Sequence, residues 1–170
     1  MSPPLSTRDV TKGYLLVPAE YLEVHPDFTL AIDLKPRLIT PHPLTNQQTL
    51  TIARGPIIYC VEDVDNEWVS DHFRSTYVDP RCLARNVVVE QEIADARWPD
   101  EKYIGITVKE AAYLVDFDKL SVDAFVEKEA LNKTIETAEL IEKLKFVPYY
   151  YRANRGGRGM ARVGLRQWMW

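Results

Sequence analysis

Apolar and polar positions alternate along much of the chain, and this pattern predicts β-strands. The segment 28–34, FTLAIDL, places an apolar residue at every second position, which is typical of a strand with one buried face. Segments of similar composition follow, rich in β-branched and aromatic residues and bounded by turn-forming residues. They are residues 13–17, 49–53, 57–61, 86–93, 103–108 and 160–165.

Prolines and glycines modify this pattern at two places. Pro36, Pro41 and Pro43 donate no amide hydrogen, so they predict a connection without strand pairing before residue 49. The dipeptide Gly55-Pro56 separates the apolar runs 49–53 and 57–61. We interpret these two runs as one bent or bulged strand at the centre of the core.

Two segments have a pattern of apolar residues that also fits a helix. Residues 111–115, AAYLV, fit either a strand or a helix. Residues 127–146 are rich in Glu, Lys, Leu and Ala, and Leu140, Ile141 and Leu144 recur at helical spacing. The sequence therefore predicts one short helical insertion near 130–145.

Six or more strands with proline and glycine between them, and at most one helix, predict an all-β fold. We expect an antiparallel β-sandwich of the jelly-roll kind with that one helical insertion. A flexible segment, 1–11, precedes a single domain, 12–170.

Charge and hydrophobicity narrow the function classes. The net charge of −4 and the pI near 5.4 give no positive field for nucleic acid or anionic lipid. The apolar run 55–61 is far shorter than the roughly 20 residues that span a bilayer. Residues 1–9 lack the pattern of a secretory signal, so we expect a cytoplasmic location with Cys60 and Cys82 as free thiols.

Two motifs carry a resemblance to a known family. Residues 54–66, RGPIIYCVEDVDN, and 147–156, VPYYYRANRG, lie about ninety residues apart. Both resemble motifs of β-L-arabinofuranosidase-like proteins, glycoside hydrolase family 127, in whose second motif Ala-Trp stands where this chain has Tyr151-Arg152. Gly157-Arg158-Gly159 also departs from the Gly-Pro-Gly-Glu that is usual there.

The resemblance implies the C-terminal β-sandwich region of such a protein. In that family an (α/α)6 barrel carries a cysteine nucleophile, a zinc ion and an acid/base glutamate, and β-sandwich domains follow it. No segment here matches those catalytic motifs, and Cys60 lies in the sandwich motif. We therefore expect a non-catalytic accessory domain that packs on a catalytic barrel or self-associates, with no metal and no cofactor.

A second hypothesis is a self-standing small enzyme that binds an apolar or cyclic metabolite in a sandwich pocket. Its acid/base candidates are His72, the histidine that does not precede a proline, and the carboxylates Glu62 and Asp65. The acidic turn that contains these two carboxylates, residues 62–66, also fits a solvated loop or a set of calcium ligands. The two cysteines and the histidines do not occur as close pairs in the sequence, so no zinc site is predicted.

Aromatic and basic residues near the C-terminus leave further alternatives open. An aromatic cluster fits either a carbohydrate or small-molecule site or the packing of a core. Its members are Tyr149, Tyr150, Tyr151 and Trp168. The arginines between 152 and 166 fit either an anion site or intramolecular ion pairs with the acidic remainder.

Overall fold

The computed structural model describes residues 10–27, 29, 32–95, 100–116, 138–153 and 155–168. The chain divides into two units, Met1–Asp33 and Leu34–Trp170. No helix in these described ranges is long and apolar enough to cross a membrane.

The first unit contains a small hairpin and one helix. Strands β1 (Val10–Thr11) and β2 (Tyr14–Leu15) pair antiparallel across Lys12-Gly13, whose positive φ angles of 51° and 85° are those of a two-residue hairpin turn. Helix α1 (Ala19–Val24) follows Pro18 and was not predicted from the sequence. The predicted strand at 28–34 lies partly outside the described residues, and residues 32–34 are not in a strand.

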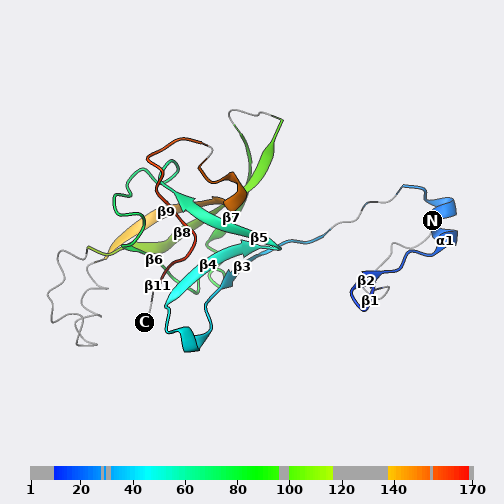
Figure 1. Ribbon diagram of the computed structural model, residues 1–170, viewed down its shortest axis with the longest axis horizontal. Helices are drawn as coiled ribbons and strands as arrows, with labels where there is room; N and C mark the ends of the chain where they lie inside the picture. The colour runs from blue at the N-terminus through cyan, green and yellow to red at the C-terminus, as the bar shows by residue number, and fades with distance from the viewer. Residues whose placement is uncertain are drawn as a thin grey trace. The chain divides into compact units, whose positions relative to one another are not determined.

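In its described residues the second unit forms one mixed sheet of nine strands (Figure 1). Two short 3-10 turns, η2 (Pro43–Thr45) and η5 (Tyr149–Tyr151), interrupt it. The strands are β3 (Pro36–Ile39), β4 (Thr49–Arg54), β5 (Ile57–Glu62), β6 (Thr76–Val78), β7 (Val88–Ala94), β8 (Lys102–Leu114), β9 (Glu139–Pro148), β10 (Ala161–Arg162) and β11 (Leu165–Gln167).

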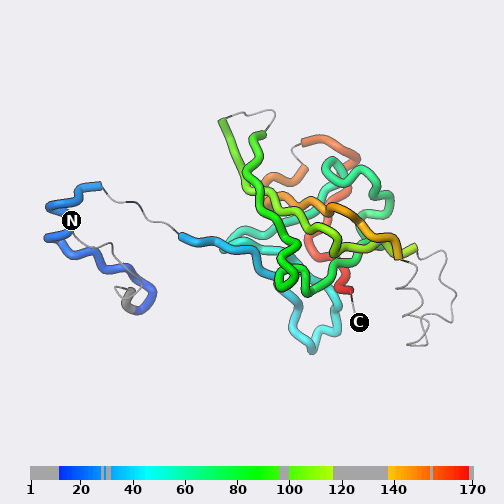
Figure 2. The backbone as a smooth tube through the Cα atoms, turned by 180° about the vertical axis from the view of Figure 1, so that it is seen from behind, coloured from blue at the N-terminus to red at the C-terminus, as the bar shows by residue number. Residues whose placement is uncertain are grey.

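The pairing order folds this sheet back on itself. It runs β10-β5-β9-β8-β6-β11-β4-β3, with β7 on β8, and β4 also pairs with β5. The pairings are antiparallel apart from that of β11 with β6. As Figures 1 and 2 show, β4 and β5 cross over β8 and β9. The predicted all-β class is confirmed.

The larger of two apolar clusters lies between the β4–β5 hairpin and strands β8 and β9. Its largest fully buried side chains come from both sides, with Leu50 and Ile52 on β4, Ile106 on β8, and Leu144 and Phe146 on β9. The alternation that predicted the strands therefore also selects the side chains that fill the core.

The helical insertion predicted near 130–145 is wrong for residues 139–145, because these residues belong to β9. Ile141 and Leu144 are both buried although they are three residues apart, and Leu140 is exposed. In the pairing with β9, β8 has one extra residue between Lys109 and Ala112. The buried spacing of three therefore occurs in a strand whose ladder is irregular, and it does not indicate a helix. Residues 130–137 lie outside the described part of the chain.

The interpretation of the proline-rich and glycine-proline segments also needs correction. Pro36 begins β3, which pairs with β4 at the sheet edge, where a missing amide is tolerated. Gly55-Pro56 forms a tight turn with φ of +55° at Gly55, and β5 returns antiparallel to β4. The two apolar runs are thus two strands of a hairpin and not one bulged strand. Residues 111–114, left open between helix and strand, belong to β8.

Both cysteines are free and buried, as predicted. Burial first, and then the neighbouring Glu62 carboxylate, raise the pKa of the Cys60 thiol to about 11. Burial likewise raises the pKa of the Cys82 thiol to about 11. Both sulfur atoms therefore stay protonated near neutral pH, the state in which a thiol is a weak nucleophile.

Candidate functional site

The acidic turn at the end of β5 and the loop between η5 and β10 meet around the guanidinium group of Arg155. We call this loop, residues 152–160, the closing loop. Arg155 donates from Nη2 to Glu62 Oε2 at 2.6 Å and from Nη1 to Asp65 Oδ1 at 3.0 Å. It also donates from Nη1 to the Tyr103 hydroxyl at 3.3 Å. The backbone amide of Ala153 adds a hydrogen bond of 2.6 Å to Glu62 Oε1. We call Glu62, Asp65, Tyr103 and Arg155 the arginine cluster.

Burial makes this cluster electrostatically strong. The side chains of Arg155 and Glu62 are 14% and 6% exposed. Burial alone would lower the pKa of Arg155, but its hydrogen bonds to Asp65 and Glu62 raise it above the ordinary value. Charge-assisted hydrogen bonds of this kind are the stronger ones in proteins, and a bidentate guanidinium fixes both partners in place.

The remaining polar groups of the acidic turn hold backbone. The Asn66 side chain donates from Nδ2 to the carbonyls of Glu62 and Lys145, and its Oδ1 accepts from the Lys145 amide at 3.0 Å. Asp63 accepts from the Arg158 amide at 2.5 Å, and a Cβ on Gly157 would lie 2.7 Å from Asp63 Oδ1. The turn is therefore fastened to both β9 and the closing loop.

The structure separates the three acid/base candidates. Glu62 and Asp65 converge on the same guanidinium, so both carboxylates already accept strong hydrogen bonds. His72 lies exposed on a turn between β5 and β6, where its φ is +55°. Among the described residues no hydrogen bond or ion pair joins His72 to either carboxylate.

The four aromatic candidates occupy different environments. Tyr149 and Tyr150 are 44% and 60% exposed, whereas Tyr151 is buried and its ring lies 4.5 Å from that of Tyr103. Trp168 is 2% exposed and stacks on Tyr113 with ring centroids 4.3 Å apart. These residues therefore do not form one platform. Tyr150 borders a hollow of about 230 Å³ beside Tyr59 and Lys102.

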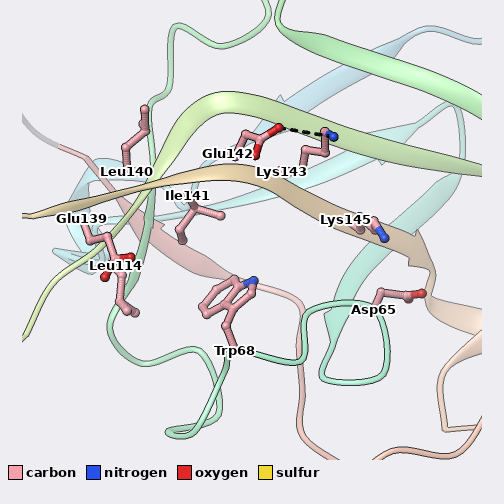
Figure 3. A pocket seen from close by; sticks show the side chains of 9 residues that line it. All are labelled: Asp65, Trp68, Leu114, Glu139, Leu140, Ile141, Glu142, Lys143 and Lys145. Atoms are coloured by element: carbon pink, nitrogen blue, oxygen red, sulfur yellow. Dashed lines mark ion pairs between the residues drawn. The ribbon is translucent and has the colours of Figure 1, made fainter.

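A larger hollow, of about 590 Å³, lies beside β9 (Figure 3). We call it the Trp68 groove. Its residues come from the loop after β5, the end of β8 and the part of β9 up to Lys145. They are Asp65, Trp68, Leu114, Glu139, Leu140, Ile141, Glu142, Lys143 and Lys145. This groove was not predicted from the sequence. Its one signal there is a tryptophan close after the acidic turn.

Taken together, the fold and the arginine cluster define a β-sheet domain whose two sequence motifs are joined in space. The hairpin strand β5 carries the first motif and pairs with the end of β9, where the second begins, at Tyr59 and Pro148. Glu62 and Arg155 then connect the turn and loop that follow. This arrangement makes the two motifs one structural unit.

Residues 36–163, about three quarters of the chain, match the glycoside hydrolase family 127 C-terminal domain. The chain therefore belongs to this family of domains, and the resemblance found in the sequence is confirmed. No curated protein matches the chain.

Solved structures show the same fold. One is a GH127 β-L-arabinofuranosidase from Geobacillus stearothermophilus T6, with 22% identity, a TM-score of 0.54, and coverage of 79% of this chain and 18% of that one. A second GH127 β-arabinofuranosidase has 20% identity, a TM-score of 0.52, and coverage of 79% and 17%. A third, a glycoside hydrolase, has 15% identity, a TM-score of 0.52, and coverage of 81% and 20%. The chain thus spans less than a quarter of the length of these relatives.

Proposed function

We propose that this chain is a non-catalytic accessory β-sandwich that packs on the catalytic barrel of a β-L-arabinofuranosidase-like glycosidase. The observation that carries the proposal is the match of residues 36–163 to the C-terminal domain of glycoside hydrolase family 127. The similar solved structures are several times longer than this chain, which leaves room for a separate catalytic part.

The arginine cluster supports a structural role for the acidic turn. A general acid must hold a proton and a general base must be able to take one. Glu62 accepts hydrogen bonds from Arg155 and from the Ala153 amide, and Asp65 accepts two from Arg155. Arg155 thus holds both carboxylates in place as hydrogen-bond acceptors. These two carboxylates therefore join the acidic turn after β5 to the closing loop, which is a structural role.

The edge strands favour a barrel partner over self-association through an open sheet edge. Among the described strands, β7 pairs with β8 alone and leaves a seven-residue edge. Charged residues on such an edge oppose strand addition. Glu90 and Glu92 lie on β7, and they form ion pairs with Arg54 and Lys102. We therefore place the docking surface on side chains and not on a free β-edge.

A hydrolysis assay on the purified chain tests the non-catalytic part of the proposal. We expect no release of product from an aryl β-L-arabinofuranoside above the buffer rate, because the carboxylates of the acidic turn are bound to Arg155. The G. stearothermophilus enzyme serves as the positive control. Turnover by the chain that is lost in His72→Ala or Glu62→Gln would instead establish the self-standing enzyme.

A further inference from the structure

Trp68 presents part of a rigidly held indole ring to solvent. Its side chain is 40% exposed, although the adjacent Val69 is buried and the Val69 amide donates to the Asn66 carbonyl at 3.1 Å. The indole packs edge-on against Phe73, with ring centroids 6.0 Å apart and planes at 83°. Phe73 is itself completely buried. The contact with Phe73 therefore orients the indole ring of Trp68, although part of that ring remains exposed to solvent.

The rest of the Trp68 groove surrounds this ring with both apolar and charged groups. Figure 3 shows Leu114 and Ile141 toward one end, and Asp65 and Lys145 toward the other, with Trp68 between them. The volume of about 590 Å³ lies within the range of small-molecule sites in proteins, roughly 300–1,000 Å³.

The charges that line the groove select among ligand classes. Three carboxylates, of Asp65, Glu139 and Glu142, stand against two ammonium groups, of Lys143 and Lys145, for a formal charge of −1. Glu142 and Lys143 form an ion pair at 3.3 Å. A phosphate or polyanion requires an excess of positive charge, which these residues do not supply. An entirely apolar ligand would desolvate the carboxylates and ammonium groups without hydrogen bonds in return.

We propose that the Trp68 groove binds a neutral saccharide, with one sugar ring packed against the exposed part of the indole. A sugar has an apolar C–H face that suits an aromatic ring, and hydroxyl groups that both donate and accept hydrogen bonds. Carboxylates such as Asp65 accept from hydroxyls, and ammonium groups such as Lys145 donate to them. The groove is open to solvent, which suits an oligosaccharide.

This inference goes beyond the proposed accessory role, because the groove lies wholly within the chain and does not require a barrel. The fixed position of Asp65 supports it. One residue thus serves two purposes, since its carboxylate pairs with Arg155 and also borders the groove. Because Asp65 is held in place before a ligand binds, the entropic cost of binding is lower.

Isothermal titration of the full chain with neutral oligosaccharides tests the proposal, with arabinotetraose, xylotetraose and cellotetraose as probes. We expect saturable binding of at least one probe, and affinity about tenfold lower in Trp68→Ala, equivalent to about 1.4 kcal/mol. Tyr150→Ala removes an exposed aromatic ring outside the groove and should leave the affinity unchanged. Circular dichroism on each variant confirms that the fold is retained.

Three results would overturn the proposal. They are no binding of any probe at millimolar concentration, binding that Trp68→Ala leaves intact, and binding that Tyr150→Ala abolishes. The last would place the ligand beside Tyr59 and Lys102 instead. None of these results bears on docking to a barrel, so failure here and failure of the accessory role are distinguishable.

Discussion

Arg155→Ala is expected to lower the free energy of unfolding by about 3–5 kcal/mol, the usual cost of removing one partner from a buried ion pair. The substitution leaves Glu62, which is 6% exposed, with an uncompensated charge, and it frees Asp65 as well. Urea denaturation followed by tryptophan fluorescence measures the change. Arg155→Lys should recover only part of the loss, because an ammonium group lacks the planar fork that reaches two carboxylates.

Arg158→Ala is the matched control for this prediction. Arg158 lies in the same closing loop and pairs with Asp63, but its side chain is 59% exposed. Its backbone amide, which donates to Asp63, survives the substitution. We expect a smaller loss than in Arg155→Ala, because solvent screens the exposed Arg158 guanidinium and the buried Asp63 carboxylate keeps its hydrogen bond from the backbone amide. Equal losses in the two variants would contradict the assignment of Arg155 as the centre of the cluster.

Trp168→Ala is expected to destabilise the fold by about 3–5 kcal/mol, the range for truncating a large buried aromatic residue. The ring stacks on Tyr113 and meets Tyr77 edge-on at 5.8 Å, while the Trp168 amide donates to the Val78 carbonyl at 2.9 Å. These contacts join the chain beyond β11 to β6 and β8. Thermal and urea unfolding curves provide the measurement.

Tyr150→Ala supplies the contrast for Trp168. Tyr150 is 60% exposed, so its loss should change stability by no more than about 0.5 kcal/mol. A large loss in Tyr150→Ala, or a negligible one in Trp168→Ala, would reverse the assignment of these two aromatic residues to surface and core.

Strands that alternate over a regular ladder could be predicted from the sequence. The segments 49–53, 86–93 and 103–108 coincide closely with β4, β7 and the first half of β8. In the structure β4 pairs in continuous register with β3, and β7 with β8. The Gly55-Pro56 turn was misread because the same dipeptide can bend a strand or reverse it, and only the pairing of β4 with β5 decides which.

The helical prediction near 140 failed because two buried residues three apart, Ile141 and Leu144, do not by themselves distinguish a helix from a strand in an irregular ladder. The extra residue of β8 between Lys109 and Ala112 makes this ladder irregular, and periodicity within β9 alone cannot reveal it. Tertiary pairing thus overrode the local pattern.

The arginine cluster was present in the sequence only as separate parts. The acidic turn and the arginine-rich loop were both noted, and intramolecular ion pairs were one of the two alternatives. Contacts over about ninety residues, such as that of Glu62 with Arg155, have no periodic signal. In the structure the two candidate carboxylates, Glu62 and Asp65, both bind Arg155, and His72 lies apart from them. The structure also identifies Trp68 as a candidate, which the sequence alone did not distinguish from a core tryptophan.

Exchange of the domain in a relative tests the central claim most directly. Removing the matched C-terminal region from the G. stearothermophilus β-L-arabinofuranosidase should destabilise its remaining part, and attaching Leu34–Trp170 of this chain in its place should restore it. The measurement is the thermal unfolding midpoint of the exchanged enzyme, with its hydrolysis rate, compared with those of the truncated enzyme. An accessory role predicts a higher midpoint and recovered hydrolysis in the exchanged enzyme. An exchanged enzyme indistinguishable from the truncated one, with the attached domain folded, would contradict packing on a catalytic barrel.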